Sequence, residues 1–168
     1  MELALIVLQC FSQEIVILKR LFFSQLLGLK IKRQQAQFYM SAKTVLVFGT
    51  FDEFHPGHEY FLKQAKHYGD RVVVSVARDA HVEHFKNKKA IHSQNERLHF
   101  IQSLGYVNEA RLSDKELDSY LIVSRIEPNV IMLGHDQFDL KKSLKAWIAK
   151  NNADIKLIDA KKYVISAT

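Results

Sequence analysis

Three short apolar runs, separated by segments with helical spacing, constrain the fold of this chain most strongly. Residues 44–48 (TVLVF), 71–77 (RVVVSVA) and 129–133 (NVIML) are rich in β-branched residues and predict strands that are buried on both faces. Strands that alternate with helices predict an α/β fold, in which helices cover both faces of a parallel sheet. Weaker strands are expected at 106–112 and 154–158, and helices at 58–68, 79–86, 95–104, 114–125 and 139–151.

The character of the sequence changes near Met40. Residues 1–39 are apolar-rich, but charged residues such as Glu14 and Lys19 interrupt them, and no run approaches the roughly 18 apolar residues of a membrane span. We interpret residues 1–39 as an N-terminal extension, or as the product of an upstream start codon, preceding a domain at 40–168. An amphipathic membrane anchor in the extension is the alternative reading.

Charge and cysteine content narrow the class of partner. The formal net charge of +6 and the isoelectric point near 9.4 favour an anionic partner, either a phosphate-rich small molecule or a nucleic acid. Because no long lysine or arginine block is present, we do not expect nucleic acid. A single cysteine, Cys10, cannot form a disulfide within the chain, which fits a reducing, cytoplasmic location.

The turn between the first strand and the first helix carries the most information about function. It reads GTFDEFHPGH over residues 49–58. In parallel α/β sheets, ligands bind at the carboxyl ends of the strands, where helix N-termini present free backbone N–H groups. Gly49 and Thr50 would let the chain approach a phosphate closely, and Gly57 would leave room above the turn for a nucleotide.

Two histidines in this turn suit phosphoryl chemistry. His55 and His58 are three residues apart, so both can face one pocket and donate hydrogen bonds to phosphate oxygens. Fixed donors stabilise the negative charge that grows when a nucleophile attacks the α-phosphorus, and no covalent intermediate is needed. Surface or helix-capping contacts are the alternative interpretation of the pair.

The turn resembles the signature of the cytidylyltransferase-like nucleotidyltransferases, G-[TS]-F-D-x-x-H-x-G-H. The resemblance implies a Rossmann-like sheet over roughly three quarters of the chain. It also implies that His55 and His58 bind the triphosphate, and that His58 stabilises the transition state. By the same resemblance, the backbone of Thr50 and Phe51 lines the phosphate site and Asp52 contacts the acceptor.

A lysine-rich segment follows the second strand and its helix. Read alone, KNKK at 86–89 is typical of a solvated loop. The longer segment KKAIHSQNER is similar to K-K-A-x-H-S-x-x-x-R of the glycerol-3-phosphate cytidylyltransferases. That resemblance implies that Lys86 binds the nucleotide phosphates, that Lys88 is catalytic, and that Arg97 orients the loop or binds the acceptor. A salt bridge on the helix surface is the alternative for Arg97.

Two further strand ends resemble FAD synthases of the archaeal type. VARD ends the second strand, and its Asp79 would contact the acceptor or cap the following helix. LGHDQ ends the strand at 129–133, and the resemblance places Asp136 near the base and ribose, with a loop cap as the alternative. The subfamily signals therefore conflict, because the lysine segment favours a cytidylyltransferase.

The end of the chain resembles only the start of a family motif. Ile165-Ser166-Ala167-Thr168 is similar to the beginning of the turn that opens the last helix of the family. Ser166 and Thr168 would then bind the nucleotide, while the domain would lack its last helix. The remaining histidines lack the spacing of metal ligands, so we expect no metal site formed by the protein alone.

Together these patterns predict a nucleotidyltransferase that moves a nucleotidyl group from a nucleoside triphosphate to a phosphate-bearing acceptor and releases pyrophosphate. Mg²⁺ accompanies the triphosphate. ATP and FMN, the substrates of an FAD synthase, are slightly preferred, and CTP with glycerol 3-phosphate or a similar alcohol phosphate is the alternative. A nucleotide-binding sensor or scaffold without turnover is the hypothesis from another class. Relatives often form homodimers, but no exposed apolar stripe in this sequence indicates one independently.

Overall fold

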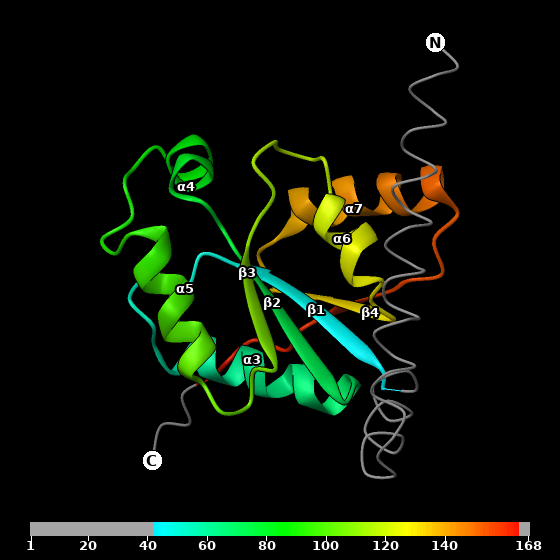
Figure 1. The fold of residues 1–168 in the computed structure, drawn as a ribbon, viewed down its shortest axis with the longest axis horizontal. Helices are drawn as coiled ribbons and strands as arrows, with labels where there is room; N and C mark the ends of the chain where they lie inside the picture. Colours follow the sequence, from blue (N-terminus) through cyan, green and yellow to red (C-terminus); the bar gives the residue numbers. More distant parts are fainter. Residues whose placement is uncertain (1–41, 165–168) are drawn as a thin grey trace, which may run out of the picture. The chain divides into compact units, whose positions relative to one another are not determined.

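A computed structural model describes residues 42–164, and within them the chain forms a parallel sheet of five strands (Figure 1). The strand order is β3-β2-β1-β4-β5, so β1 lies at the centre and the order reverses between β1 and β4. The extension predicted at 1–39 lies outside the described residues. The strands are β1 (Thr44–Gly49), β2 (Arg71–Val76), β3 (Glu109–Leu112), β4 (Val130–Leu133) and β5 (Lys156–Asp159).

Helices cover both faces of this sheet, as the sequence predicts. Helices α3 and α5 pack on one face, and α6 and α7 pack on the other (Figure 1). No helix in the described part of the chain is long and apolar enough to span a membrane. The helices are α3 (Pro56–Tyr68), α4 (Asp79–Lys86), α5 (Gln94–Ser103), α6 (Leu121–Ile126) and α7 (Phe138–Asn151).

The central strands are apolar on both faces because each face meets a helical layer. Val45 and Val47 of β1 face the core that contains α3 and α5, whereas Leu46 between them faces the core of α6 and α7. Leu46 pairs with Val73 of β2 and Ile131 of β4, and all three side chains are fully buried. Two-sided burial explains why these strands read as continuous apolar runs rather than alternating ones.

The helix predicted over 114–125 is wrong in its first half. Only Leu121–Ile126 is helical, and the residues before it form a loop. Asp118 and Tyr120 have left-handed backbone angles, with φ of 55° and 48°, which end a right-handed helix. The Asp114 carboxylate accepts a hydrogen bond from the backbone N–H of Ile122 at 2.9 Å, so it satisfies a free donor at the start of the short helix.

The two weaker strands are also shorter or shifted relative to the sequence pattern. The strand expected at 106–112 begins only at Glu109. Asn108, just before it, bonds to Val72 of β2 twice: its backbone N–H donates to the Val72 carbonyl at 3.0 Å, and its side-chain Oδ1 accepts the Val72 N–H at 2.9 Å. The strand expected at 154–158 spans Lys156–Asp159. Both belong to the edges of the sheet, where burial constrains the sequence least.

Candidate active site

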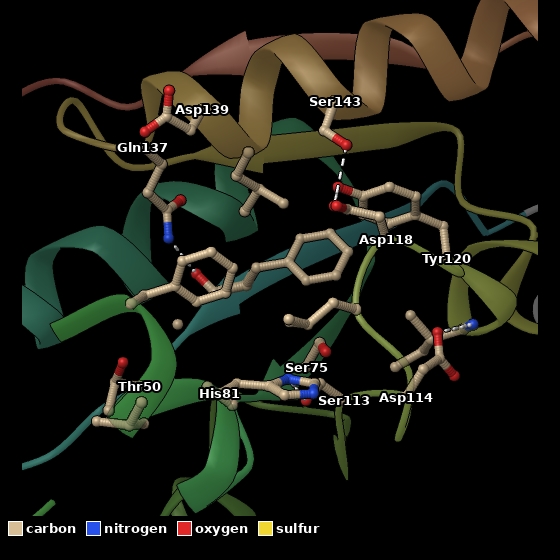
Figure 2. Close-up of a pocket in the computed structure, with 18 of the residues that line it drawn as sticks. Thr50, Ser75, His81, Ser113, Asp114, Asp118, Tyr120, Gln137, Asp139 and Ser143 are labelled. Atoms are coloured by element: carbon tan, nitrogen blue, oxygen red, sulfur yellow. Dashed lines mark hydrogen bonds between the residues drawn. The ribbon is translucent and has the colours of Figure 1, made fainter. Parts of the chain in front are cut away.

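Two adjoining cavities lie at the carboxyl edge of the sheet. The larger, of about 820 Å³, contains the β1–α3 turn with both of its histidines, and we call it the histidine cavity. The smaller, of about 490 Å³, lies between α4, the loop before α6 and the start of α7, and we call it the apolar cavity (Figure 2). The residues that line both cavities are Phe48, Gly49, Thr50, Lys86, Asp136 and Gln137.

Gly49 and Phe51 shape the start of the turn. A Cβ atom on Gly49 would lie 2.6 Å from the ring of Phe51, which is closer than atoms can approach. The Phe51 ring is buried (3% exposed), although its backbone has a φ of 54° that is uncommon for a bulky residue. Packing therefore explains why position 49 is a glycine, since a side chain there would clash with the Phe51 ring. The close approach of Gly49 to a phosphate stays a prediction, as does the phosphate contact of the Phe51 backbone.

His55 caps helix α3 through its side chain. Its Nδ1 accepts a hydrogen bond from the backbone N–H of Gly57 at 3.1 Å, in the first turn of the helix. Because a backbone N–H can only donate, this bond leaves the ring proton on Nε2, so His55 presents an N–H donor beyond the cap. A Cβ on Gly57 would lie 2.9 Å from the His55 ring, so Gly57 makes room for this capping geometry.

His58 stacks on His55 inside the histidine cavity. The two ring centroids are 3.8 Å apart, and the edge of Phe51 packs against His58 with centroids 5.4 Å apart. The half-buried His58 ring has a buried Nδ1 without a hydrogen-bond partner among the described residues. Burial, then the charges of His55 and Lys86, lower the pKa of His58 from 6.5 to about 4. His58 is therefore neutral at physiological pH.

This pKa shift predicts how stability changes in acid. A histidine whose pKa falls from 6.5 to about 4 on folding stabilises the native state fully above pH 6.5. That contribution is lost as the pH falls from 6.5 toward 4. Solvent screens part of this effect, because the ring is only half-buried. Between pH 7 and pH 5 the free energy of unfolding should therefore fall by about 1 kcal/mol more in the wild type than in His58→Gln.

Urea unfolding of both proteins at the two pH values measures this difference. Because the acidic residues of the two proteins are the same, their contributions cancel in the comparison. An equal loss of stability in wild type and His58→Gln would contradict the buried, neutral state of His58.

The sequence predicts two lysines and Asp136 at the site, and of these the structure places only Lys86 and Asp136 in the walls of the cavities. Lys86 ends α4 and lines both cavities, whereas Lys88 is exposed in the following loop and lines neither. Asp136 follows β4 and also lines both cavities. The structure therefore brings Lys86 and Asp136 to the histidines. The catalytic role of Lys88 stays a prediction that requires its loop to move toward the site.

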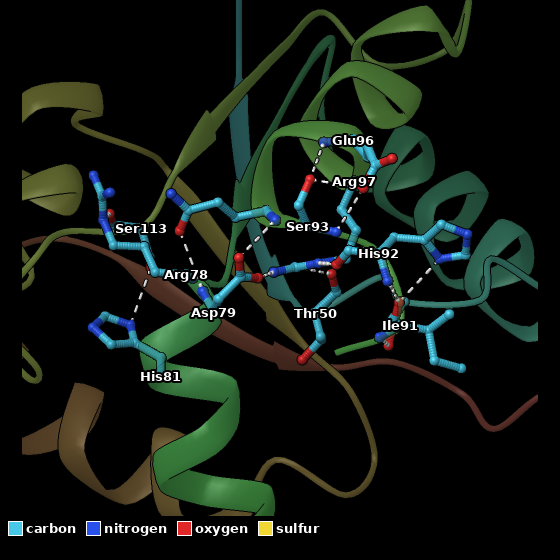
Figure 3. A network of polar contacts seen from close by, with 12 residues as sticks. Thr50, Arg78, Asp79, His81, Ile91, His92, Ser93, Glu96, Arg97 and Ser113 are labelled. Atoms are coloured by element: carbon cyan, nitrogen blue, oxygen red, sulfur yellow. Dashed lines mark hydrogen bonds and ion pairs between the residues drawn. The ribbon is translucent and has the colours of Figure 1, made fainter. Parts of the chain in front are cut away.

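Arg97 is buried in a polar network rather than placed in a cavity (Figure 3). Its side chain is 2% exposed, and its Nη1 donates to the backbone carbonyl of Thr50 at 2.6 Å. Its Nη2 donates to Asp79 Oδ1 at 2.6 Å, and its Nε donates to the carbonyl of His92 at 3.1 Å. This geometry fits one of the two roles predicted for Arg97, which is to orient the segment that follows the lysines at 86–89. A direct contact of Arg97 or Asp79 with the acceptor stays a prediction.

The side chain of Asp52, like that of Arg97, is bonded to other parts of the protein. Its carboxylate accepts the backbone N–H groups of Ile91 at 2.8 Å and His92 at 3.1 Å. Burial alone would raise the pKa of Asp52, but these hydrogen bonds outweigh it and lower the pKa. Asp52 therefore connects the β1–α3 turn to Ile91 and His92, which follow the lysines at 86–89. It lines neither cavity, and its predicted contact with the acceptor is untested.

Some site residues had no signal in the sequence, and others lie outside the described part. Ser75, Phe85 and Phe138 line the apolar cavity, but each lies within an ordinary strand or helix pattern that indicates no function.

Gln137 accepts the N–H of Gly134 at 2.7 Å and donates to the carbonyl of Phe48 at 3.0 Å, so it joins the end of β4 to β1. The predicted nucleotide-binding residues Ser166 and Thr168 lie beyond the described residues.

Comparison with known proteins identifies the family. A family model described as cytidylyltransferase-like matches residues 46–168. The chain belongs to the cytidylyltransferase-like family. An FAD synthase of Methanohalophilus mahii is 38% identical over 68% of this chain and 78% of its own length. An FAD synthase of Thermococcus sibiricus is 40% identical over 68% of this chain and 77% of its own length.

A solved structure agrees with this assignment. The lipopolysaccharide core biosynthesis protein from Thermoplasma volcanium is 34% identical and superposes with a TM-score of 0.69, covering 74% of this chain and all (100%) of that protein. The resemblance predicted from the turn motif and the Rossmann-like fold are thus confirmed. This cytidylyltransferase-like chain is a nucleotidyltransferase that is similar to FAD synthases.

Proposed function

We propose that this chain transfers the AMP group of ATP to FMN, forming FAD and pyrophosphate. The observation that carries the proposal is the common wall of the two cavities at the carboxyl edge of β1, formed by residues such as Thr50 and Lys86. A transfer between two bound substrates needs such a meeting point. The similarity to archaeal FAD synthases supports the choice of ATP and FMN.

In this proposal ATP binds in the histidine cavity. The Nε2–H group of His55 and the N–H group of neutral His58 donate to phosphate oxygens, and the positive end of helix α3 favours their negative charge. Lys86, which lines both cavities, contacts the phosphates at the junction. The backbone of the β1–α3 turn lines the same space, which fits the family's phosphate-binding motif.

The chemical step is an in-line displacement. An oxygen of the FMN phosphate attacks the α-phosphorus of ATP, one phosphorus–oxygen bond forms, and the bond to the bridging oxygen of pyrophosphate breaks. The FMN phosphate is already ionised near neutral pH, so the reaction needs no general base. His58 stabilises the charge that develops on the transferring group, because its donor is fixed by stacking on His55 before the reaction begins.

Mg²⁺ fits this site as a partner of the triphosphate. Among residues 42–164, no cluster of three or more His, Cys, Asp or Glu side chains could hold a metal ion. Mg²⁺ commonly binds through one or two carboxylates together with substrate phosphates, and Asp136 offers one carboxylate where the cavities meet. When bound, the ion neutralises charge on the leaving pyrophosphate.

Pyrophosphate release by the full chain tests the proposed reaction. We would supply ATP or CTP with either FMN or glycerol 3-phosphate, in the presence of Mg²⁺. We expect release with ATP and FMN alone. Release with CTP and glycerol 3-phosphate would replace this function by the cytidylyltransferase that the KKAIHS segment resembles. ATP binding without release from any pair would support a nucleotide sensor instead.

A further inference from the structure

The apolar cavity forms where the helices of one layer stop covering the sheet. Phe48 of β1 and Ser75 of β2 are paired neighbours that lie on the same sheet face as the buried Leu46 and Val73. Toward the amino ends of the strands, α6 and α7 cover this face. At the carboxyl end the face is bounded by further apolar side chains, Val82, Leu117, Ile122 and Leu140.

Two aromatic side chains in the wall of this cavity are unusually exposed. Phe85, in the last turn of α4, is 67% exposed, and Phe138, the first residue of α7, is 74% exposed. Exposed apolar surface next to a cavity is characteristic of ligand sites, because a bound ligand covers it. Rings that contribute large area and few rotatable bonds are suited to pack against another planar ring.

The cavity also contains a buried hydroxyl. Ser75 is 1% exposed, and its Oγ has no hydrogen-bond partner among the described residues (Figure 2). Buried hydroxyls are normally hydrogen-bonded, and one that lines a cavity is available to a ligand. A ligand that is apolar on its faces but has a polar atom on its edge would satisfy both the ring wall and Ser75.

Charge fixes the direction in which such a ligand enters. Lys86 lies with Asp136 on the side shared with the histidine cavity, whereas the rest of the described wall has four acidic residues and no lysine or arginine. A phosphate group is repelled by the acidic part and attracted to Lys86, so only an uncharged ring suits the interior. The four acidic residues are Asp114, Glu116, Asp118 and Asp139.

The loop that carries Asp114, Glu116 and Asp118 is held in place by α4 and by Arg78, the residue before this helix. His81 of α4 contacts the hydroxyl of Ser113 through Nδ1 at 3.2 Å (Figures 2 and 3). Its Nε2 contacts the backbone carbonyl of Lys115 at 3.1 Å. Arg78 donates from Nε to the carbonyl of Ser113 at 2.8 Å. With the wall fixed in this way, the cavity is preformed, and ring binding does not require a nucleotide to be bound first.

We propose that the apolar cavity binds the planar ring system of the acceptor, packed against Phe85 and Phe138, with Ser75 bonded to its polar edge. The cavity of about 490 Å³ falls in the size range of sites for ring-containing ligands, and a three-carbon alcohol phosphate would leave most of it unfilled. This inference rests on the proposed function, since it assigns the isoalloxazine ring of FMN to the cavity.

Binding of the flavin ring without its phosphate tests the assignment. The probe is lumiflavin, which keeps the isoalloxazine ring but lacks the ribityl chain and the phosphate, and its fluorescence is titrated with the full chain in the absence of nucleotide. We expect saturable binding that weakens about tenfold in Phe85→Ala and in Phe138→Ala. Phe100→Ala is the matched control, because Phe100 is also exposed (45%) but lines neither cavity.

Ser75→Ala separates binding from folding. We expect severalfold weaker lumiflavin binding with an unchanged or raised melting temperature, because alanine removes a buried hydroxyl without a protein partner among the described residues. A purely structural role of Ser75 would instead lower the melting temperature and leave lumiflavin binding intact, which would contradict its contact with the ring.

The outcomes distinguish this inference from the proposed function. Absence of lumiflavin binding to the folded wild type, or equal binding by wild type, Phe85→Ala and Phe138→Ala, would overturn the ring site, even if FAD is formed from ATP and FMN. Lumiflavin binding with the expected losses would support the ring site even if ATP and FMN yield no FAD, and in that case the proposed reaction alone would fail.

Discussion

Replacing His58 with alanine is expected to lower the turnover of ATP and FMN to FAD by roughly 10²- to 10³-fold, while ATP affinity changes far less. His58 is neutral, stacked on His55 and held beside Phe51, so its donor is fixed before the transition state forms. A fixed donor contributes most where charge develops during the reaction, and so its loss lowers kcat more than binding.

Steady-state kinetics of FAD formation, together with calorimetric binding of ATP, measure this effect. His67→Ala is the matched control, because His67 lies on the same helix, is exposed and lines neither cavity. His58→Asn keeps an uncharged donor and should recover part of the lost rate. A kcat in His58→Ala within a few-fold of the wild type would contradict the role of His58.

Replacing Arg97 with methionine is expected to destabilise the protein by about 3 kcal/mol. The buried guanidinium joins the carbonyl of Thr50 in the β1–α3 turn to Asp79 and to the carbonyl of His92. Methionine fills much of the space but leaves these acceptors without their donor, so the cost is the loss of a buried charged network. Because Thr50 lies at the wall between the cavities, FAD formation should fall as well.

Urea unfolding of Arg97→Met at pH 7 measures the destabilisation. Arg111→Met is the matched control, since Arg111 pairs with Glu109 through a side chain that is 54% exposed, and surface pairs contribute about 0–1 kcal/mol. Arg97→Lys restores the charge but not the forked geometry, so its stability should lie between those of Arg97→Met and the wild type. Equal losses in Arg97→Met and Arg111→Met would contradict a structural role for the network.

The sequence was sufficient to predict the central sheet and the position of the β1–α3 turn. Strands such as Thr44–Gly49 are buried on both faces, so nearly every residue must be apolar and the pattern is unmistakable. The turn with His55 and His58 is a local motif, and its parts are neighbours in the sequence. The loop at 114–120 lies within the helix that the sequence predicts at 114–125, whereas Asp118 and Tyr120 adopt left-handed backbone angles, and Asp118 accepts a hydrogen bond from the hydroxyl of Ser143 in α7 at 3.0 Å.

The apolar cavity could not be predicted in the same way. Ser75 and Phe85 come from the consecutive elements β2 and α4, whereas Phe138 comes from α7, more than fifty residues later. The three meet only when the sheet edge and the helix ends are placed in three dimensions. The roles expected for Asp52 and Arg97 came from motif positions. The structure adds that both bond to the protein itself, which single-sequence spacing does not reveal.

The central claim, that AMP passes to a flavin phosphate where the two cavities meet, is tested most directly by the fate of labelled phosphate. The full chain would be incubated with FMN, Mg²⁺ and ATP carrying label at either the α- or the γ-phosphate. We predict that α-label appears in FAD and γ-label in pyrophosphate. Release of γ-label as inorganic phosphate, or recovery of all label in ATP while ATP and FMN are both bound, would contradict the claim.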